Sequence, residues 1–113
     1  MIQTKFQNCI EACGKCAVAC SQCAVACLNE KDLEHLKTCI QLNLECTMIC
    51  DVAVKVMSID GQLSEELCEI CADICERCAE ECEKHAAMGM EHCRECAEAC
   101  RICTRICREM SAA

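Results

Sequence analysis

The chain has 113 residues, which is enough for one compact domain spanning 1–113 and too few for two. It contains no proline, three glycines, one phenylalanine as its only Phe, Tyr or Trp residue, and a formal net charge of −8. This composition disfavours β-sheets, and the absence of a basic stripe with interleaved aromatic residues argues against nucleic-acid binding. What remains unusual is a total of nineteen cysteines.

The N-terminal segment 1–8 lacks the charged and apolar regions of a secretory signal. No apolar run of about 18 residues is evident, so we expect no membrane-spanning segment. The simplest location is the cytoplasm, where thiols stay reduced.

The first predicted helix covers residues 2–28. Its cysteines recur in steps of three and four, a spacing that places side chains on one stripe of an α-helix. They are Cys9, Cys13, Cys16, Cys20, Cys23 and Cys27. The opposite face carries Val18 and Val25, followed by Leu28. Apolar residues on that outer face predict a second contact, and hence self-association.

The second predicted helix covers residues 32–58, with Asp32 as a candidate N-cap. Its stripe holds fewer cysteines: Cys39, Cys46 and Cys50. Asn43 occupies an intermediate position of the stripe. Two interpretations of this amide are open: it bonds to a backbone carbonyl, or it lies beside a bound metal ion.

Residues 59–62 are typical of a turn, and Ser64 with two following glutamates suits the start of a third helix over 64–87. Gly89 separates it from a fourth helix over 90–111. Both helices repeat the three-and-four spacing. Their cysteines are Cys68, Cys71, Cys75, Cys78, Cys82, Cys93, Cys96, Cys100, Cys103 and Cys107.

Short connections between long helices predict an all-α fold, an antiparallel up-down four-helix bundle with a cysteine-lined core. Disulfides fit this pattern poorly, because neighbours three or four residues apart on a helix do not reach disulfide geometry without strain. The number of cysteines is also odd. We therefore expect thiols or thiolates.

A core of cysteine buries less apolar area than a core of leucine and gains less stability from the hydrophobic effect. Metal–thiolate bonds can supply the missing stability, so the cysteines predict bound metal. Zinc in a Cys₄ site keeps a −2 charge, which is costly to bury repeatedly without nearby cations. Cu(I) binds two or three sulfurs, and with bridging thiolates it approaches neutrality. All nineteen cysteines are therefore predicted ligands for many Cu(I) ions per chain. A zinc or general soft-metal thiolate buffer is the alternative.

Three histidines fall at one end of the predicted bundle, together with Met88 and Met90. They are His35, His85 and His92. These side chains are candidate entry or accessory ligands for copper. In the competing interpretation, His85 acts as a cation at a helix C-terminus and the other two are surface residues. Met57 and Met110 map to the opposite end, where methionine can plug a core.

The cysteine runs at 9–27, 68–82 and 93–107, with the stretches 44–51 and 71–78, resemble the bacterial copper storage proteins over essentially the whole chain. The resemblance implies a homotetramer of bundles filled with Cu(I) for storage or detoxification, and no catalysis. Lacking an export signal, the chain resembles the cytosolic branch, and a copper chaperone is a further candidate partner. A thiol redox enzyme is disfavoured because redox cysteines are normally exposed at helix N-termini.

Overall fold

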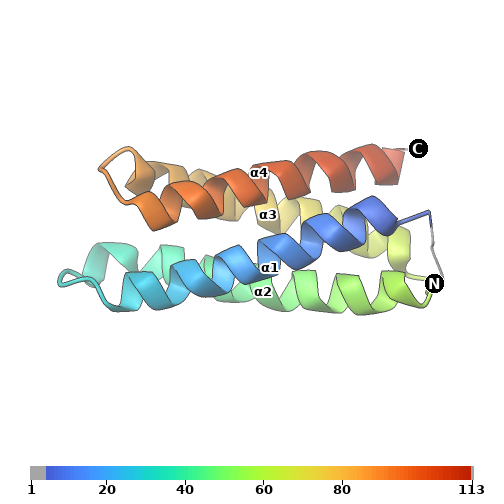
Figure 1. The fold of residues 1–113 in the computed structure, drawn as a ribbon, viewed down its shortest axis with the longest axis horizontal. Helices are drawn as coiled ribbons and strands as arrows, with labels where there is room; N and C mark the ends of the chain where they lie inside the picture. Colours follow the sequence, from blue (N-terminus) through green and yellow to red (C-terminus); the bar gives the residue numbers. More distant parts are fainter. Residues whose placement is uncertain (1–4, 113) are drawn as a thin grey trace.

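The computed structural model describes residues 5–112 and shows a rod of four long helices, 45 × 20 × 20 Å (Figure 1). The elements are α1 (Gln7–Leu28), the 3₁₀ turn η1 (Glu34–Leu36), α2 (Lys37–Ser58), α3 (Ser64–Ala86) and α4 (Glu91–Ala112). Successive helices run in opposite directions (Figure 1). The predicted antiparallel four-helix bundle is therefore confirmed.

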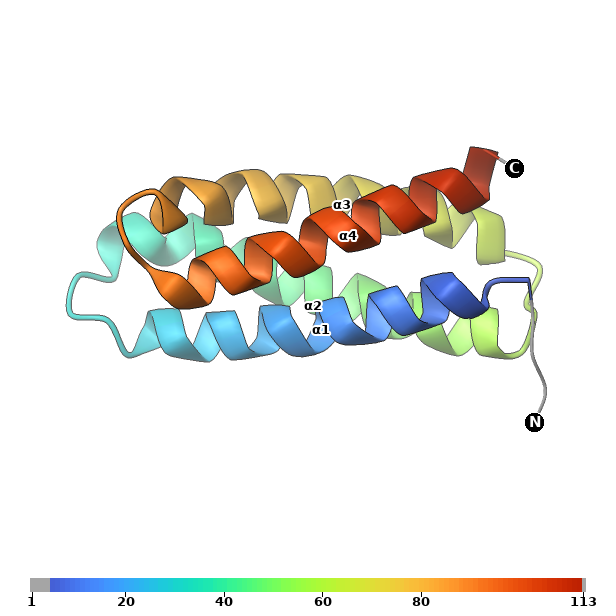
Figure 2. The same ribbon diagram turned by 45° about the horizontal axis from the view of Figure 1, so that its top comes forward.

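Each helix packs against two neighbours: α1 against α2 and α4, and α3 against α2 and α4. Figure 2 shows the four rods surrounding a common axis. The α1–α2 and α3–α4 connections lie together at one end, which we call the histidine end after His35, His85 and His92. The α2–α3 connection lies at the other, which we call the methionine end after Met57 and Met110.

Two predicted helix starts need correction. The second helix begins at Lys37 rather than at Asp32, because η1 intervenes. The Asp32 carboxylate pairs with the His35 ring instead, with Oδ2 and Nδ1 3.3 Å apart. The first helix begins at Gln7, after Phe6, and residues 2–4 of its predicted range lie outside the described residues.

The predicted turn at 59–62 and the break at Gly89 are both confirmed. Asp60 adopts a positive φ of 50°, and the amide of Gly61 then donates to the carbonyl of Val56 at 2.9 Å. A Cβ on Gly61 would lie 2.7 Å from the Val56 side chain, so this close approach requires glycine. Gly89 has a φ of 92°, a left-handed conformation that side chains with a Cβ rarely adopt.

Small residues flank the cysteine stripes and let the helices approach. These buried alanines are Ala12, Ala17, Ala24, Ala53, Ala72, Ala79 and Ala97. On the outside, α3 and α4 are joined by ion pairs. The Arg101 guanidinium donates to Glu83 at 2.8 and 2.9 Å, and Arg108 donates to Glu76 at 2.9 and 3.1 Å. These contacts lower the pKa of both carboxyl groups and fix the register of the two helices.

By length and mean hydropathy, 1.2 over its most apolar window, α1 alone among the described helices is apolar enough to cross a membrane. This differs from the expectation that no segment of the chain would be long and apolar enough to span a membrane. The hydropathy comes largely from cysteine, alanine and valine, and the cysteines of α1 pack inside the bundle. The high mean hydropathy of α1 is therefore that of a helix whose apolar side chains belong to the core of the bundle.

Candidate metal centre

The thiols of all nineteen cysteines are free and buried, each with at most 1 % of its surface exposed. They form a continuous file along the bundle axis, which we call the sulfur column. Many neighbouring Sγ atoms lie close together, as in the pair Cys13–Cys71 at 3.4 Å and the pair Cys23–Cys27 at 4.0 Å. The prediction that the thiols point to a shared axis and are not joined in disulfides is confirmed.

The local sequence explains why no thiol faces outwards. Steps of three and four residues average close to the helical period of 3.6, so a stripe that starts on the axis stays on the axis over six turns of α1. Four such stripes face one another because the connections are short and the helices alternate in direction.

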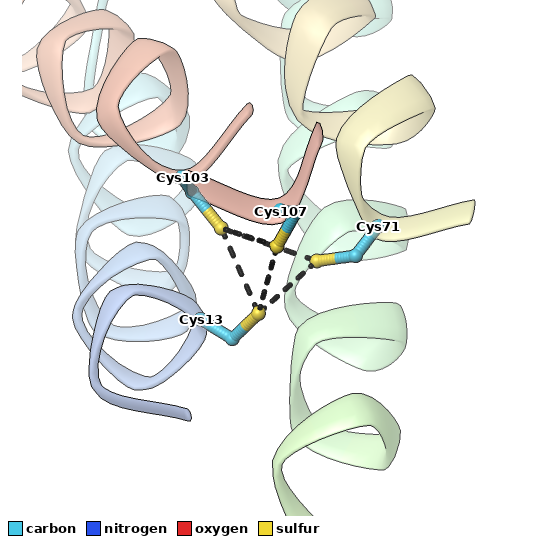
Figure 3. Close-up of side chains that lie close together, drawn as sticks. All are labelled: Cys13, Cys71, Cys103 and Cys107. Carbon is cyan, nitrogen blue, oxygen red and sulfur yellow. Dashed lines mark hydrogen bonds between the residues drawn. The ribbon is translucent and has the colours of Figure 1, made fainter. Parts of the chain in front are cut away.

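Sulfurs from different helices meet in groups of four. In Figure 3, Cys13 of α1, Cys71 of α3, and Cys103 and Cys107 of α4 point toward one another. The Cys13 sulfur lies 3.4 Å from Cys71 and 3.7 Å from each of the two α4 sulfurs. No single helix supplies the group, so the site exists only in the folded bundle.

Further tetrads continue along the column, and in each the four Sγ atoms lie within 4.8 Å of one another. They include Cys16/Cys46/Cys50/Cys75, Cys16/Cys20/Cys46/Cys100, Cys20/Cys78/Cys96/Cys100 and Cys23/Cys27/Cys39/Cys93. Several of these groups have sulfurs in common. The middle of the column is therefore a chain of overlapping sites.

The sulfur spacing suits metal coordination. A metal–thiolate bond of about 2.3 Å separates the sulfurs of a tetrahedral or trigonal site by roughly 3.8–4.0 Å. Adjacent sulfurs such as those of Cys13 and Cys71 lie 3.4 Å apart and those of Cys71 and Cys103 lie 4.0 Å apart, so metal binding needs only small side-chain movements. These distances fit Cu(I) and zinc alike, and the charge of the core must distinguish them.

The core offers thiolates no positive partner. Among the described residues, the only buried polar side chains besides cysteine are Asn43, Ser64, His85 and Thr104. Burial is the largest effect raising the pKa of Cys27, whereas hydrogen bonds from Cys107 and Cys68 lower the pKa of Cys9 to about 4. The thiols with raised pKa remain protonated until a bound cation compensates their charge.

Asn43 contacts the column through both ends of its amide. Its Oδ1 accepts from the thiols of Cys78 at 3.1 Å and Cys96 at 3.4 Å, and its Nδ2 donates to Cys39 at 3.8 Å. These partners are cysteine sulfurs and not the backbone carbonyl of the first interpretation. The position of this amide oxygen among thiols supports the second interpretation, in which Asn43 lies beside bound metal.

The three histidines gather at the histidine end, as predicted. His92 is half-buried, and its Nε2 lies 3.5 Å from the sulfur of Cys27, the last cysteine of α1. His35 is more exposed, and its ring centroid lies 5.6 Å from that of His85. Met90 packs against the core nearby, whereas Met88 is exposed.

His85 is buried, and its two ring nitrogens have different surroundings. Nε2 lies 3.0 Å from the carboxylate of Glu81, one turn earlier on α3, while Nδ1 is buried without a hydrogen-bond partner. A ring N–H directed at Glu81 leaves a lone pair on Nδ1, which is what a metal ligand requires. His85 does lie in the last turn of α3, as its competing role as a C-terminal cation requires. Glu81 was not predicted, and its spacing of four residues from His85 was the available signal.

Comparison with known protein families shows to which family the chain belongs. The family model described as copper storage protein matches residues 2–112. The chain belongs to the copper storage protein family. This relationship agrees with the buried sulfur column and with the resemblance found in the sequence.

Solved structures of the family superpose closely. The Cu(I)-bound copper storage protein BsCsp3 of Bacillus subtilis is 45 % identical, with a TM-score of 0.89 over 96 % of this chain and 99 % of that one. A cytosolic copper storage protein from Streptomyces lividans, in a structure with five coppers, is 39 % identical, with a TM-score of 0.91 over 96 % of this chain and 92 % of that one.

A curated relative is described as the uncharacterized cysteine-rich protein YhjQ of Bacillus subtilis. It is 48 % identical over 65 residues, which are 58 % of this chain and 60 % of that protein. The match therefore leaves two fifths of the relative's length without a counterpart.

Proposed function

We propose that this chain stores or sequesters Cu(I) in the sulfur column, with all nineteen cysteines as ligands and many ions per chain. The observation that carries the proposal is a continuous file of buried thiols, with no buried lysine or arginine among the described residues. A core of this kind gains stability when a soft cation replaces its protons. Its role is binding, for copper supply or for detoxification, and not catalysis.

Charge favours Cu(I) over zinc. A Zn(Cys)₄ unit carries −2, and several such units in one dry column would repel one another without cations nearby. A Cu⁺ ion that shares bridging thiolates brings one positive charge per sulfur and leaves the column close to neutral. The overlap of neighbouring tetrads supplies bridging sulfurs of this kind.

His35, His85 and His92 support entry at the histidine end. Support comes from the contact between His92 and the Cys27 thiol, and from the buried Nδ1 of His85, which has no hydrogen-bond partner among the described residues. Imidazole is a borderline ligand, so it can receive copper and release it to thiolate. We assign these residues to entry, with capacity residing in the cysteines.

We further propose a homotetramer in the cytoplasm, loaded by a copper chaperone. Support for self-association comes from the outer faces of two adjacent helices, where Val18 and Val25 of α1 are 57 % and 60 % exposed. Leu44, Met48 and Val52 of α2 are also exposed. Apolar residues grouped on the α1–α2 side of a bundle are typical of an interface between copies.

A titration tests the storage function. Reduced protein is titrated with Cu(I) under anaerobic conditions against a strong competing chelator, and we expect saturation on the order of one ion per thiol. The control is the quadruple variant with serine at Cys16, Cys20, Cys46 and Cys100, which should lose several equivalents. Saturation at about four or five ions per chain would favour zinc-like tetrahedral sites and contradict the proposal.

A further inference from the structure

Met57 occupies a core position on the same stripe of α2 as its buried cysteines. It lies in the last turn of α2 and continues the stripe of Cys46, Cys50 and Ala53 toward the methionine end. Its side chain is completely buried, as are all the core cysteines around it. On α2, the stripe of core sulfurs therefore ends in a thioether and not a thiol.

The thioether contacts a thiol directly. The Cys68 thiol donates to Met57 Sδ at a sulfur–sulfur distance of 3.5 Å, within the range found between cysteines in the tetrads. The same thiol interacts with the thiols of Cys9 and Cys107. Three thiols and one thioether from four helices thus converge at the methionine end.

Packing alone does not require a sulfur here. At the histidine end the fully buried large apolar residue is Leu36, which fills space without a donor atom. At the methionine end Met110 is only partly buried and packs against the core. Of these residues, Met57 is the one whose sulfur is directed at a thiol.

The thioether of Met57 can bind Cu⁺ without adding negative charge to the core. Cu⁺ bound to Cys68 and Met57 forms a neutral site, since one thiolate balances the ion and the thioether adds a soft ligand without charge. In the exchange, the S–H bond of Cys68 breaks, a Cu–S bond forms and the proton leaves to solvent, so no electron transfer is involved. The geometry points to a copper site at the methionine end in which Met57 Sδ and Cys68 Sγ are ligands, with Cys9 or Cys107 as the neighbouring sulfur.

This inference rests on the proposed storage of Cu(I), and the test separates the two. Protein labelled with ¹³C at the methionine methyl groups is titrated with Cu(I), which is diamagnetic, and the methyl resonances are followed by NMR. The Met57 resonance is assigned from Met57→Leu, a substitution that nearly conserves volume. We expect a large shift of the Met57 methyl on loading and little shift for Met48, which is 62 % exposed on the same helix.

The capacity of variants provides the second measurement. Met57→Leu and Cys68→Ser should each bind about one copper fewer than the parent chain, and the double variant should lose no more than Cys68→Ser alone. The matched control Met48→Leu should load like the parent. Circular dichroism of each apo variant verifies that the bundle is folded.

A parent chain that fills with copper while the Met57 methyl shifts no more than that of Met48, or while Met57→Leu keeps full capacity, would overturn the methionine site alone. A parent chain that saturates at about four or five ions would overturn the storage function itself.

Discussion

At the scale of single residues, Asn43 has the most consequential position in the column. Its amide is neutral, completely buried and bonded to thiols of three helices. A neutral amide can accept S–H donors and yet add no charge to a core that holds no buried lysine or arginine in the described part of the chain. The presence of asparagine rather than aspartate at this position therefore affects the stability of the apo protein.

Asn43→Asp should destabilise the apo bundle by about 3 kcal/mol or more at pH 7, because it leaves an uncompensated buried carboxylate. The effect should shrink toward pH 4, where the carboxyl group binds a proton. Chemical denaturation at the two pH values measures both. Gln41→Glu, the same change of charge at an exposed site on α2, should be nearly neutral.

Some contacts of single residues could be predicted from the sequence and others could not. The cysteine stripes were predictable, because spacing along one helix determines which face a residue occupies. The contacts of Glu81 with His85 were within reach for the same reason. The partners of Asn43 and the contact between Met57 and Cys68 were not, since they depend on the axial offset of one helix against another.

At the scale of elements, α1 and α2 differ from α3 and α4 on their outer faces. The α3–α4 pair carries many charged residues and is tied by the pairs Arg101–Glu83 and Arg108–Glu76. Its exposed large apolar side chains are Ile70 and Ile102. The α1–α2 pair instead exposes Val18, Val25 and three apolar residues of α2. This asymmetry fits a bundle with one face toward water and one toward another copy.

Replacing Val18 and Val25 together by aspartate should therefore reduce the oligomeric mass, because charge at the centre of an apolar contact opposes association. Light scattering coupled to gel filtration measures the mass. Ile59→Asp, at a 79 % exposed position in the α2–α3 connection, is the control and should leave the mass unchanged. An unaltered mass for the double variant would exclude the α1–α2 face as the interface.

Helix boundaries were predicted unevenly, and the reasons are local. The helix ends at Leu28 and Ser58 and the break at Gly89 were predicted, because Asn29 follows the first helix, Asp60 lies in the turn after the second, and Gly89 itself forms the break. The start of α2 was misplaced because the Asp32 carboxylate bonds to His35 and not to a backbone amide. A carboxylate such as that of Asp32 can bond either to a backbone amide at a helix N-terminus or to a nearby side chain, and the sequence alone does not show which of the two it bonds to.

At the scale of the whole molecule, burial of the thiols makes the stability of the apo bundle depend on pH. The hydrogen bond with Cys107 lowers the pKa of Cys68, but contact with Cys9 and burial outweigh it and raise this pKa from 9.0 to about 12. Above pH 9 such thiols stay protonated in the folded chain and ionise in the unfolded chain. Thiols of lowered pKa are ionised in both states there and contribute no slope.

The free energy of unfolding of the reduced apo protein should therefore fall as the pH rises from 9 toward 12, because the folded state binds more protons in this window. Anaerobic denaturant titrations at pH 8 and pH 10.5 measure the change. The copper-loaded protein, whose thiols have already lost their protons, should show a much smaller dependence. Equal slopes for the two forms would contradict this account of the core.

The overlap of the tetrads has a consequence for how an ion travels through the bundle. The groups Cys16/Cys46/Cys50/Cys75 and Cys16/Cys20/Cys46/Cys100 have two sulfurs in common, and the latter shares Cys20 and Cys100 with the group that follows. An ion that moves one group along the axis thus keeps half of its bonds while it changes the others. Transit through this middle part of the rod therefore requires no bare cation in a medium of low polarity, the state that would set the highest barrier.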